Sequence, residues 1–584
     1  MSLLNKASLI QIPSGYKDGT LYSAKPINGD GDFTFSRGSN LAATRVNSEG
    51  LIEKGRENLT LYSQDFDNAS WTKVNATVTA NNTTAPDGTN TADLITSTST
   101  NETGVYYFPS VTGINTWSIY AKKGTGRYLL LNTNTPTIAT KFDLQDGVIV
   151  GTPSTGAIPS IQDVGDGWYR CSITSSTSTN RFTIFITDNT TTNDFGSSIG
   201  LTLSIWGAQL EQGLVPTSYI KTTTTTEQAG ILEDMPRLDY SGGASCGSLL
   251  LEPQRTNLIT QSEYFGAWTL NNVLITNNDT TSPEGLDNAA KWSASSGLSQ
   301  KNIYQVLTCS SGVAHTTSVY FKADEYPLAL IRLGGITDSP YVIYDLRDES
   351  VVSTSGLTSH TIESVANDWY RIDATATTSS TIIAPNFAFL PESGYTLTSL
   401  NIPQYTGDGT SGGYIYGAQV ESSASYATSY IPTYGSSVTR GAEQYNKVIT
   451  SLVPDATTFT WEVDFIVPEF ASGGGEIFGR NAAGTTQLRL YANNGGVIRF
   501  RVESGGQNYD TAVSVGDTAK CIFRCSSGVV SAFYNGVKIH TFTGVSMDFG
   551  KIQFGTPVTS PKIIRSLVFP TALTDAECIK LTTI

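Results

Sequence analysis

The chain has 584 residues and a formal net charge of -15 at pH 7, and charged residues make up only 15% of it. This length exceeds the size at which one hydrophobic core stops growing, so several domains are expected. The acidic charge argues against nucleic-acid binding, and no apolar run approaches the ~20 residues that span a bilayer. The N-terminus also lacks the apolar core of a signal peptide, which predicts a protein made without an export signal.

Short runs of β-branched and aromatic residues recur between Gly, Pro and Asn, which predicts an all-β protein. The first 50 residues are Gly-rich and do not supply a full set of strands. We therefore expect them to dock onto another structure rather than fold alone.

A tandem repeat occupies the middle of the chain. NLTLYSQDFDNASWT at Asn58 returns as NLITQSEYFGAWT at Asn257, and IWGAQLE at Ile205 returns as IYGAQVE at Ile415. Each copy has short alternating runs separated by turn residues, which predicts two β-sandwich jelly rolls. The polar tract KTTTTTEQAG at residues 221–230 predicts a linker between them.

The strand WGAQLE alternates in character. We expect Trp206, Ala208 and Leu210 on one face, and Gln209 and Glu211 on a face wetted by solvent.

The six cysteines are too few and scattered for a disulfide framework. Alternation places Cys171, Cys521 and Cys525 at core positions, which favours reduced, buried thiols over metal ligands.

The repeat stops after Arg440, and the remaining runs predict a third sandwich. Asn535-Gly536 is a strong hairpin turn signal, and Thr574 with Glu577 fits the capping box of a short C-terminal helix. The predicted divisions are an N-terminal segment 1–50, a first jelly roll 51–221, a connecting segment 222–250, a second jelly roll 251–440, and a final sandwich 441–584.

Longer motifs carry a family resemblance. IYQVLTCSSGVAHTTSVYFKA from Ile303 to Ala323, followed by the WYR and GAQ strands, resembles the jelly-roll carbohydrate-binding modules attached to xylanases and glucanases. The first copy departs from it with Tyr107 where the second has Gln305. AFYNGVKIHTF and SLVFPTALTDAE make the last unit similar to concanavalin A-like and laminin G sandwiches.

The order of LIQIPSGYKDGTLYSAKP, FSRGSNLAATRVNSEGLIE and NLTLYSQDF resembles bacteriophage virion appendage proteins of the head-fibre or tail-fibre type. This resemblance implies a protein made in the host cytoplasm and displayed on the virion surface, with residues 1–50 docking it to other virion proteins. It also implies a homo-oligomer, a trimer by the same resemblance, and weak sugar sites would gain avidity from such repetition.

One pair of carboxylates has the spacing of a glycosidase. TWEVDFIVPEF supplies Glu462 and Asp464 as in laminarinase-type enzymes, whose two carboxylates flank the scissile bond. Ile466 and Val467 stand where the second glutamate belongs, and Glu469 falls out of register. We therefore predict that the chain is not an enzyme.

Two further motifs are explained by turns. GASCG around Ser245 matches the nucleophile elbow of hydrolases but lacks the strand before it and the helix after it. NGDGD at Asn28 and DVGDG at Asp163 alternate oxygen ligands without completing a calcium loop. No cofactor is predicted, and structural calcium is left open.

Glycan binding by a sandwich depends on aromatic rings that stack on sugar faces. Rings shared by both copies belong to the framework, and rings that differ are freer to contact a ligand. These candidate carbohydrate-binding residues are Tyr107, Trp117, Tyr128, Trp292, Tyr326 and Tyr341.

The sequence thus predicts a structural virion protein that binds host-surface glycan. Two alternatives stay open. A glycan depolymerase would carry a carboxylate pair in an open cleft, and a purely structural particle component would bury its sandwich faces against neighbouring subunits.

Overall fold

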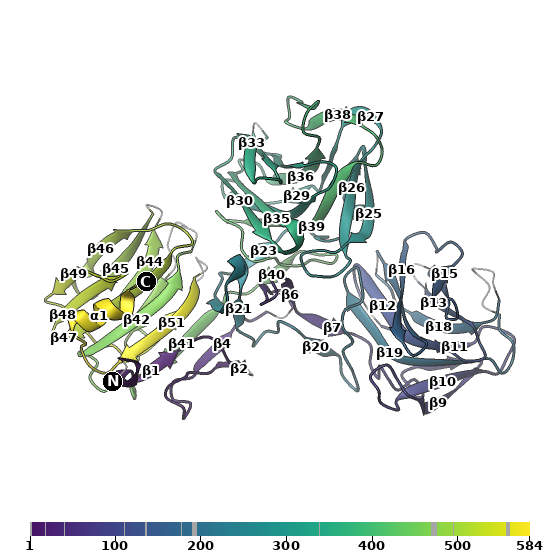
Figure 1. Cartoon of the computed structure of the whole chain (residues 1–584), viewed down its shortest axis with the longest axis horizontal. Coiled ribbons are helices and arrows are strands. Elements are labelled where there is room, and N and C mark those ends of the chain that lie inside the picture. The colour runs from purple at the N-terminus through teal and green to yellow at the C-terminus, as the bar shows by residue number, and fades with distance from the viewer. Residues whose placement is uncertain are drawn as a thin grey trace.

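The computed structural model describes residues 3–17, 19–39, 41–109, 111–134, 137–176, 178–189, 196–337, 339–468, 476–493, 496–555 and 561–583. They form three β-sandwich lobes (Figure 1), and the all-β tandem-sandwich prediction is confirmed. The one α-helix in these ranges is α1 (Asp575–Thr582), which begins with the predicted capping box of Thr574 and Glu577. No described helix has both the length and the apolar character that a bilayer crossing requires.

The first jelly roll consists of two six-stranded antiparallel sheets. Their strand orders are β16-β17-β12-β19-β10-β9 and β15-β14-β13-β18-β11-β8. Alternating apolar side chains from both sheets, including Trp71, Trp117 and Phe142, fill the core between them. The strands are β8 (Thr72–Val74), β9 (Ala76–Thr83), β10 (Ala92–Ser97), β11 (Gly104–Tyr107), β12 (Asn115–Lys123), β13 (Tyr128–Asn134), β14 (Thr137–Asp143), β15 (Val148–Val150), β16 (Ala157–Gly165), β17 (Trp168–Ser175), β18 (Phe182–Thr187) and β19 (Thr202–Gln212).

The second jelly roll repeats this topology strand for strand. Its principal orders are β34-β35-β30-β39-β26-β25 and β33-β32-β31-β36-β28-β24. The corresponding strands are β24 (Thr269–Asn271), β25 (Val273–Thr280), β26 (Ala289–Ala294), β28 (Asn302–Tyr304), β30 (Ala314–Ala323), β31 (Leu328–Gly334), β32 (Tyr341–Asp345), β33 (Ser350–Ser355), β34 (Ser359–Val365), β35 (Trp369–Thr377), β36 (Ile382–Leu390) and β39 (Gly412–Ser422). Smaller strands flank them: β23 (Arg255–Asn257), β27 (Gly297–Gln300), β29 (Leu307–Thr308), β37 (Thr396–Leu397), β38 (Pro403–Gly407) and β40 (Val438–Arg440).

The GAQ strand β19 differs from its prediction in two ways. The register with β12 shifts next to Gly207, whose φ is +65°, so Trp206 packs outside the sandwich while Ala208 lies in the core. The face expected to be wet is also buried, because Gln209 and Glu211 bind the chain that follows the strand. Gln209 accepts a hydrogen bond from the backbone N–H of Ile220 at 2.8 Å.

The third sandwich is built from both ends of the chain. One of its sheets includes β1 and the hairpin of β21 and β22, which lies in the predicted connecting segment, and the other includes β2, β3 and β4. Segment 1–50 therefore docks within its own chain, and the domain is discontinuous. Its strands are β1 (Leu9–Gln11), β2 (Tyr16–Lys17), β3 (Thr20–Leu21), β4 (Phe33–Ser36), β21 (Arg237–Asp239), β22 (Ser248–Leu250), β41 (Gln444–Val448), β42 (Phe459–Ile466), β43 (Glu476–Arg480), β44 (Thr486–Asn493), β45 (Val497–Val502), β46 (Gln507–Ala512), β47 (Thr518–Ser526), β48 (Val529–Tyr534), β49 (Val537–Thr543), β50 (Lys551–Phe554) and β51 (Lys562–Phe569).

Between the lobes run two short pairs of strands. β5 (Thr44–Val46) pairs with β6 (Ile52–Lys54), and β7 (Arg56–Asn58) pairs with β20 (Glu227–Ala229). The polar tract is therefore partly ordered. Thr222 within it is fully buried, because its hydroxyl donates to the carbonyl of Thr60 and its N–H donates to Ser63.

A buried cluster of charges joins the third lobe to the second. Arg237 of β21 binds Glu443 and Glu252, and it lies 2.8 Å from an oxygen of each. Arg440, at the end of the second jelly roll, also reaches Glu252 at 2.8 Å, and Arg37 reaches Glu443 at 2.9 Å. Burial alone would raise the pKa of Glu252, but the guanidinium groups hold it well below its ordinary range.

Removing one cation should leave these carboxylates buried without compensation. We expect Arg237→Met to destabilise the third lobe by about 3–5 kcal/mol. The free energy of unfolding would be measured by denaturant titration, with limited proteolysis as the readout. The control is Arg347→Met, which removes an exposed ion pair and should change the stability little. Equal effects of the two variants would contradict the structural role of the cluster.

Candidate ligand-binding site

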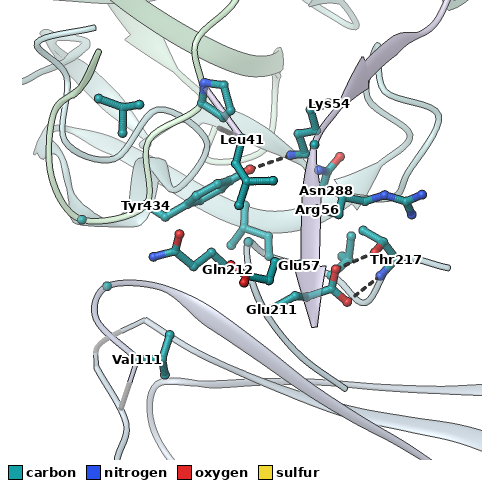
Figure 2. A pocket seen from close by; sticks show the side chains of 18 of the residues that line it. Leu41, Lys54, Arg56, Glu57, Val111, Glu211, Gln212, Thr217, Asn288 and Tyr434 are labelled. Atoms are coloured by element: carbon teal, nitrogen blue, oxygen red, sulfur yellow. Dashed lines mark hydrogen bonds between the residues drawn. The ribbon is translucent and has the colours of Figure 1, made fainter. Parts of the chain in front are cut away.

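A cavity of about 730 Å³ lies between the two jelly rolls, where the connecting segments cross (Figure 2). Three parts of the chain line it. Leu41 and residues 54–59 come from the segment that leads into the first jelly roll, residues 111–113, 178 and 211–217 from the first jelly roll, and residues 261, 284–288 and 432–438 from the second. The volume falls within the range typical of small-molecule sites.

The inner end of the cavity is fixed by Lys54. Its ammonium group lies 3.0 Å from an oxygen of Glu263, 3.0 Å from an oxygen of Glu284, and 2.7 Å from the hydroxyl of Tyr434. Burial alone would lower the pKa of Lys54, but the two carboxylates raise it well above its ordinary value. Lys54 therefore stays charged and holds the β5–β6 hairpin on the second jelly roll.

Buried tyrosines complete this network. Tyr416 donates to Glu284 at 2.8 Å, and Tyr430 donates to Glu263 at 3.0 Å. Burial raises the pKa of both phenols well above the ordinary value, so both remain hydrogen-bond donors at neutral pH. The polar groups of the cavity wall at Lys54 are consequently hydrogen-bonded to one another, which makes this wall rigid.

The first jelly roll supplies the opposite wall through Glu211. Its carboxylate accepts hydrogen bonds from the backbone N–H and the hydroxyl of Thr217. Burial raises its pKa, although these hydrogen bonds oppose the shift. Gln212 beside it is exposed and donates to the carbonyl of Thr112 at 3.2 Å.

Several polar groups on the lining have no partner within the described part of the chain. The side-chain oxygens of Asn288 and Gln261 are buried acceptors that lack a donor, and Asn288 is only 2% exposed. Arg56 makes no side-chain ion pair or hydrogen bond among the described residues. An unmet buried acceptor is costly, so the lining favours a ligand that offers hydroxyl or amide donors.

Direct contacts between the two jelly rolls hold the cavity at a fixed width. The N–H of Ile114 donates to the carbonyl of Tyr434 at 3.0 Å, and the amide of Asn278 donates to the carbonyl of Leu214 at 2.9 Å. Gly113 approaches this region so closely that a Cβ atom there would lie 1.5 Å from the carbonyl oxygen of Tyr434. A glycine is required at position 113 for the two domains to meet.

The six predicted aromatic residues lie elsewhere. Five of them are buried, and each contacts a protein partner: Tyr107 packs on Trp71, Trp117 on Phe182, Trp292 on Phe389 and Tyr326 on Tyr405, while Tyr341 bonds Ser353. Tyr128 on β13 is half-buried under Arg127.

The structure does not bring these six rings together, because they belong to two domains. At the five buried positions the two copies have different residues, and their cores pack differently there. Their role in sugar binding stays a prediction, and the cavity is built from other residues. Most of the residues that line the cavity lie at the edges of the repeat, where no periodic pattern of the sequence identifies them.

The Glu462 and Asp464 pair lies on β42, facing away from the core that contains Trp461 and Val463. Arg565 binds both carboxyl groups, at 2.9 Å for Asp464. Burial, together with the charge of Asp464, raises the pKa of Glu462, and Arg565 opposes this shift. Glu469, which the sequence places out of register, lies outside the described residues.

The remaining motifs form local structure. Ser245 is exposed in the loop between β21 and β22. Asn28 and Asp163 accept hydrogen bonds from backbone N–H groups two residues further on, as in Asx turns. All six cysteines are free thiols, and Cys171, Cys521 and Cys525 are buried. Within the described ranges, no group of three or more His, Cys, Asp or Glu residues is arranged to hold a metal ion.

Solved structures provide the comparisons. The tandem CBM22-1 and CBM22-2 domain of Paenibacillus barcinonensis Xyn10C matches at 12% identity, over 63% of this chain and 98% of that one, with a TM-score of 0.19. The LG1-3 region of the laminin alpha2 chain matches at 11% identity over 81% and 96%, with a TM-score of 0.16. No family model and no curated protein matches the chain.

The prediction that the chain is not an enzyme is contradicted. Trypanosoma rangeli sialidase in complex with sialic acid also matches, at 9% identity over 100% of this chain and 97% of that one, with a TM-score of 0.21. We therefore withdraw that prediction, and hydrolysis has to be measured alongside binding.

The close approach of Gly113 gives a test of the domain arrangement. Gly113→Ala adds a Cβ atom onto the carbonyl of Tyr434 and disfavours the φ of +74°. We expect the two jelly rolls to separate, which small-angle X-ray scattering would detect as a larger radius of gyration. The control Gly88→Ala has a similar φ of +83° but open space around its Cβ. An unchanged scattering profile for Gly113→Ala would contradict the contact.

Glu462 gives a test that depends on pH. A carboxyl group whose pKa is raised by folding contributes stability below its ordinary pKa of about 4.3 and loses that contribution as the pH rises. We expect Glu462→Gln, which stays neutral, to gain stability relative to the native protein between pH 5 and pH 8. Thermal unfolding at both pH values would measure it, with the exposed Glu102→Gln as control. An equal difference at both pH values would contradict the raised pKa.

Proposed function

We propose that this protein is a structural subunit of a virion appendage, a fibre or decoration protein, that binds host-surface glycan in the cavity between its twin jelly rolls. One observation carries the proposal. Among the described residues, the cavity combines two buried acceptors that lack donors, at Asn288 and Gln261, with a cation that has no side-chain partner, Arg56, and an exposed amide at Gln212.

A saccharide has the chemistry that these groups need. Its hydroxyl groups donate to the amide oxygens and accept from Arg56 and Gln212, and its apolar ring faces suit Leu41, Leu286 and similar neighbours. The surrounding network around Lys54 is already paired, so it would orient the lining without competing for the ligand.

The attachment to the particle is assigned to the third lobe. Residues 9–36 contribute β1 to β4 to its sheets, and the N-terminal and C-terminal ends both lie in this lobe (Figure 1). We propose that the N-terminal strands β1 to β4 of this lobe contact other virion proteins, while the two jelly rolls reach the host surface. A homo-oligomer, proposed as a trimer, would multiply weak sugar sites.

Binding to a glycan array tests the proposal. We expect a saccharide to bind the native chain and the double variant Asn288→Ala with Gln261→Ala to bind it roughly tenfold more weakly, because two hydrogen bonds are lost. The matched control is Gln145→Ala, an exposed amide on the first jelly roll. Released oligosaccharides would be measured in the same samples to detect hydrolysis.

Two outcomes would overturn the proposal. Either no saccharide binds, or the double variant binds as tightly as the control while folding normally. Labelling of assembled particles with an antibody against this chain would test the virion location separately, and its absence from particles would rule that location out.

A further inference from the structure

A band of arginines and aromatic rings lies on the outer face of the third sandwich. Leu488 and Leu490 of β44 point into the core, so the residues that alternate with them point outward. The same alternation applies along β43 and β45. The outward residues, which we call the arginine face, are Phe478, Arg480, Arg489, Tyr491, Arg499 and Arg501.

Strand register brings these side chains together. Phe478 lies opposite Arg489, which in turn lies opposite Arg501 on the next strand. The guanidinium of Arg480 lies 4.4 Å from the centre of the Phe478 ring, and that of Arg489 lies 5.1 Å from the centre of the Tyr491 ring. The rings hold the long arginine side chains in place, which lowers the entropy lost on binding a ligand.

Among its described side chains, the arginine face carries more positive than negative charge. Glu503 pairs with Arg489 at 3.3 Å and with Arg501 at 2.9 Å, and Asp510 pairs with Arg499. Arg480 has no carboxylate partner among the described residues, and its guanidinium group donates to the carbonyl of Gly484 at 2.9 Å. Side chains of Arg499 and Arg501 remain 28% and 27% exposed.

Such a face is unusual on a chain with a net charge of -15. We infer that it binds an anionic polysaccharide, a chain that carries about one carboxylate or sulfate group on each sugar. The planar guanidinium group of arginine binds two oxygens of a carboxylate or sulfate group through parallel hydrogen bonds. The interleaved carboxylates of Glu503 and Asp510 can accept hydrogen bonds from sugar hydroxyls, but they would repel the dense phosphates of a nucleic acid.

This site is independent of the proposed saccharide cavity, because it lies on another lobe. The full-length chain is tested for binding to polygalacturonate, with neutral dextran, double-stranded DNA and anionic phospholipid vesicles as comparison probes. At 50 mM salt we expect polygalacturonate to bind and dextran not to bind. The affinity should fall steeply as salt is raised, because the contacts are ionic.

Two variants test the residues. Arg499→Gln with Arg501→Gln should weaken polygalacturonate binding at least tenfold. Asn508→Asp changes an exposed residue whose side-chain oxygen lies 3.1 Å from Arg501, so it adds a negative charge beside Arg501 and removes only the long hydrogen bond that the amide donates to the carbonyl of Gly506. We expect it to weaken binding several-fold. The control is Arg347→Gln on the second jelly roll, an arginine that is also exposed and ion-paired.

Three results would overturn the inference: polygalacturonate binding no tighter than dextran, native affinity in both arginine-face variants, or tighter binding of DNA or vesicles than of polygalacturonate. Asn288→Ala in the cavity should leave polygalacturonate binding unchanged. A loss with that variant would place the anionic polysaccharide in the cavity instead. The experiments can therefore contradict the cavity proposal and the arginine-face proposal independently.

Discussion

The buried ion cluster around Arg237 is the constraint on which the arrangement of the lobes depends. Its members come from the N-terminal segment, from the connecting hairpin and from the junction after the second jelly roll. Each charge is buried, so each needs its partners in place at once. Segments that would otherwise be flexible linkers thereby become fixed, and the third lobe is held against the second.

The duplication supplies two equal frameworks, and a few substitutions make them unequal. The side-chain amides of Asn58 and Asn257 donate equivalent hydrogen bonds in the two copies, to the carbonyls of Ile220 and Ile431. Where the second copy has Glu263, however, the first has Gln64. Of these two residues, Glu263 carries a charge, and together with Glu284 it neutralises Lys54 and holds the β5–β6 hairpin on the second jelly roll. The asymmetric docking creates one cavity between the copies, in place of two equivalent sites.

The two ligand surfaces follow different chemistry. The cavity offers neutral acceptors and the guanidinium group of Arg56, which the described residues leave without a side-chain partner, and this suits a hydroxyl-rich ligand. The arginine face offers fixed cations on an open sheet, which suits an extended anionic chain. A protein with both could hold two kinds of sugar through different lobes, and each surface is rigid because paired neighbours support it.

Local and repeated structure can be predicted from the sequence. The turn at Asn535-Gly536, the cap at Thr574 and the buried thiols at Cys521 and Cys525 follow from patterns within a few residues, and the twin jelly rolls follow from the repeat. The other features depend on how distant segments pack. The cavity, the ion cluster and the N-terminal strands in the last sandwich join residues hundreds of positions apart, and the bulge at Gly207 reversed the expected face of Trp206. Side-chain alternation sets the face of a residue within a regular strand, but it carries no information about which distant strand will pair or pack against it.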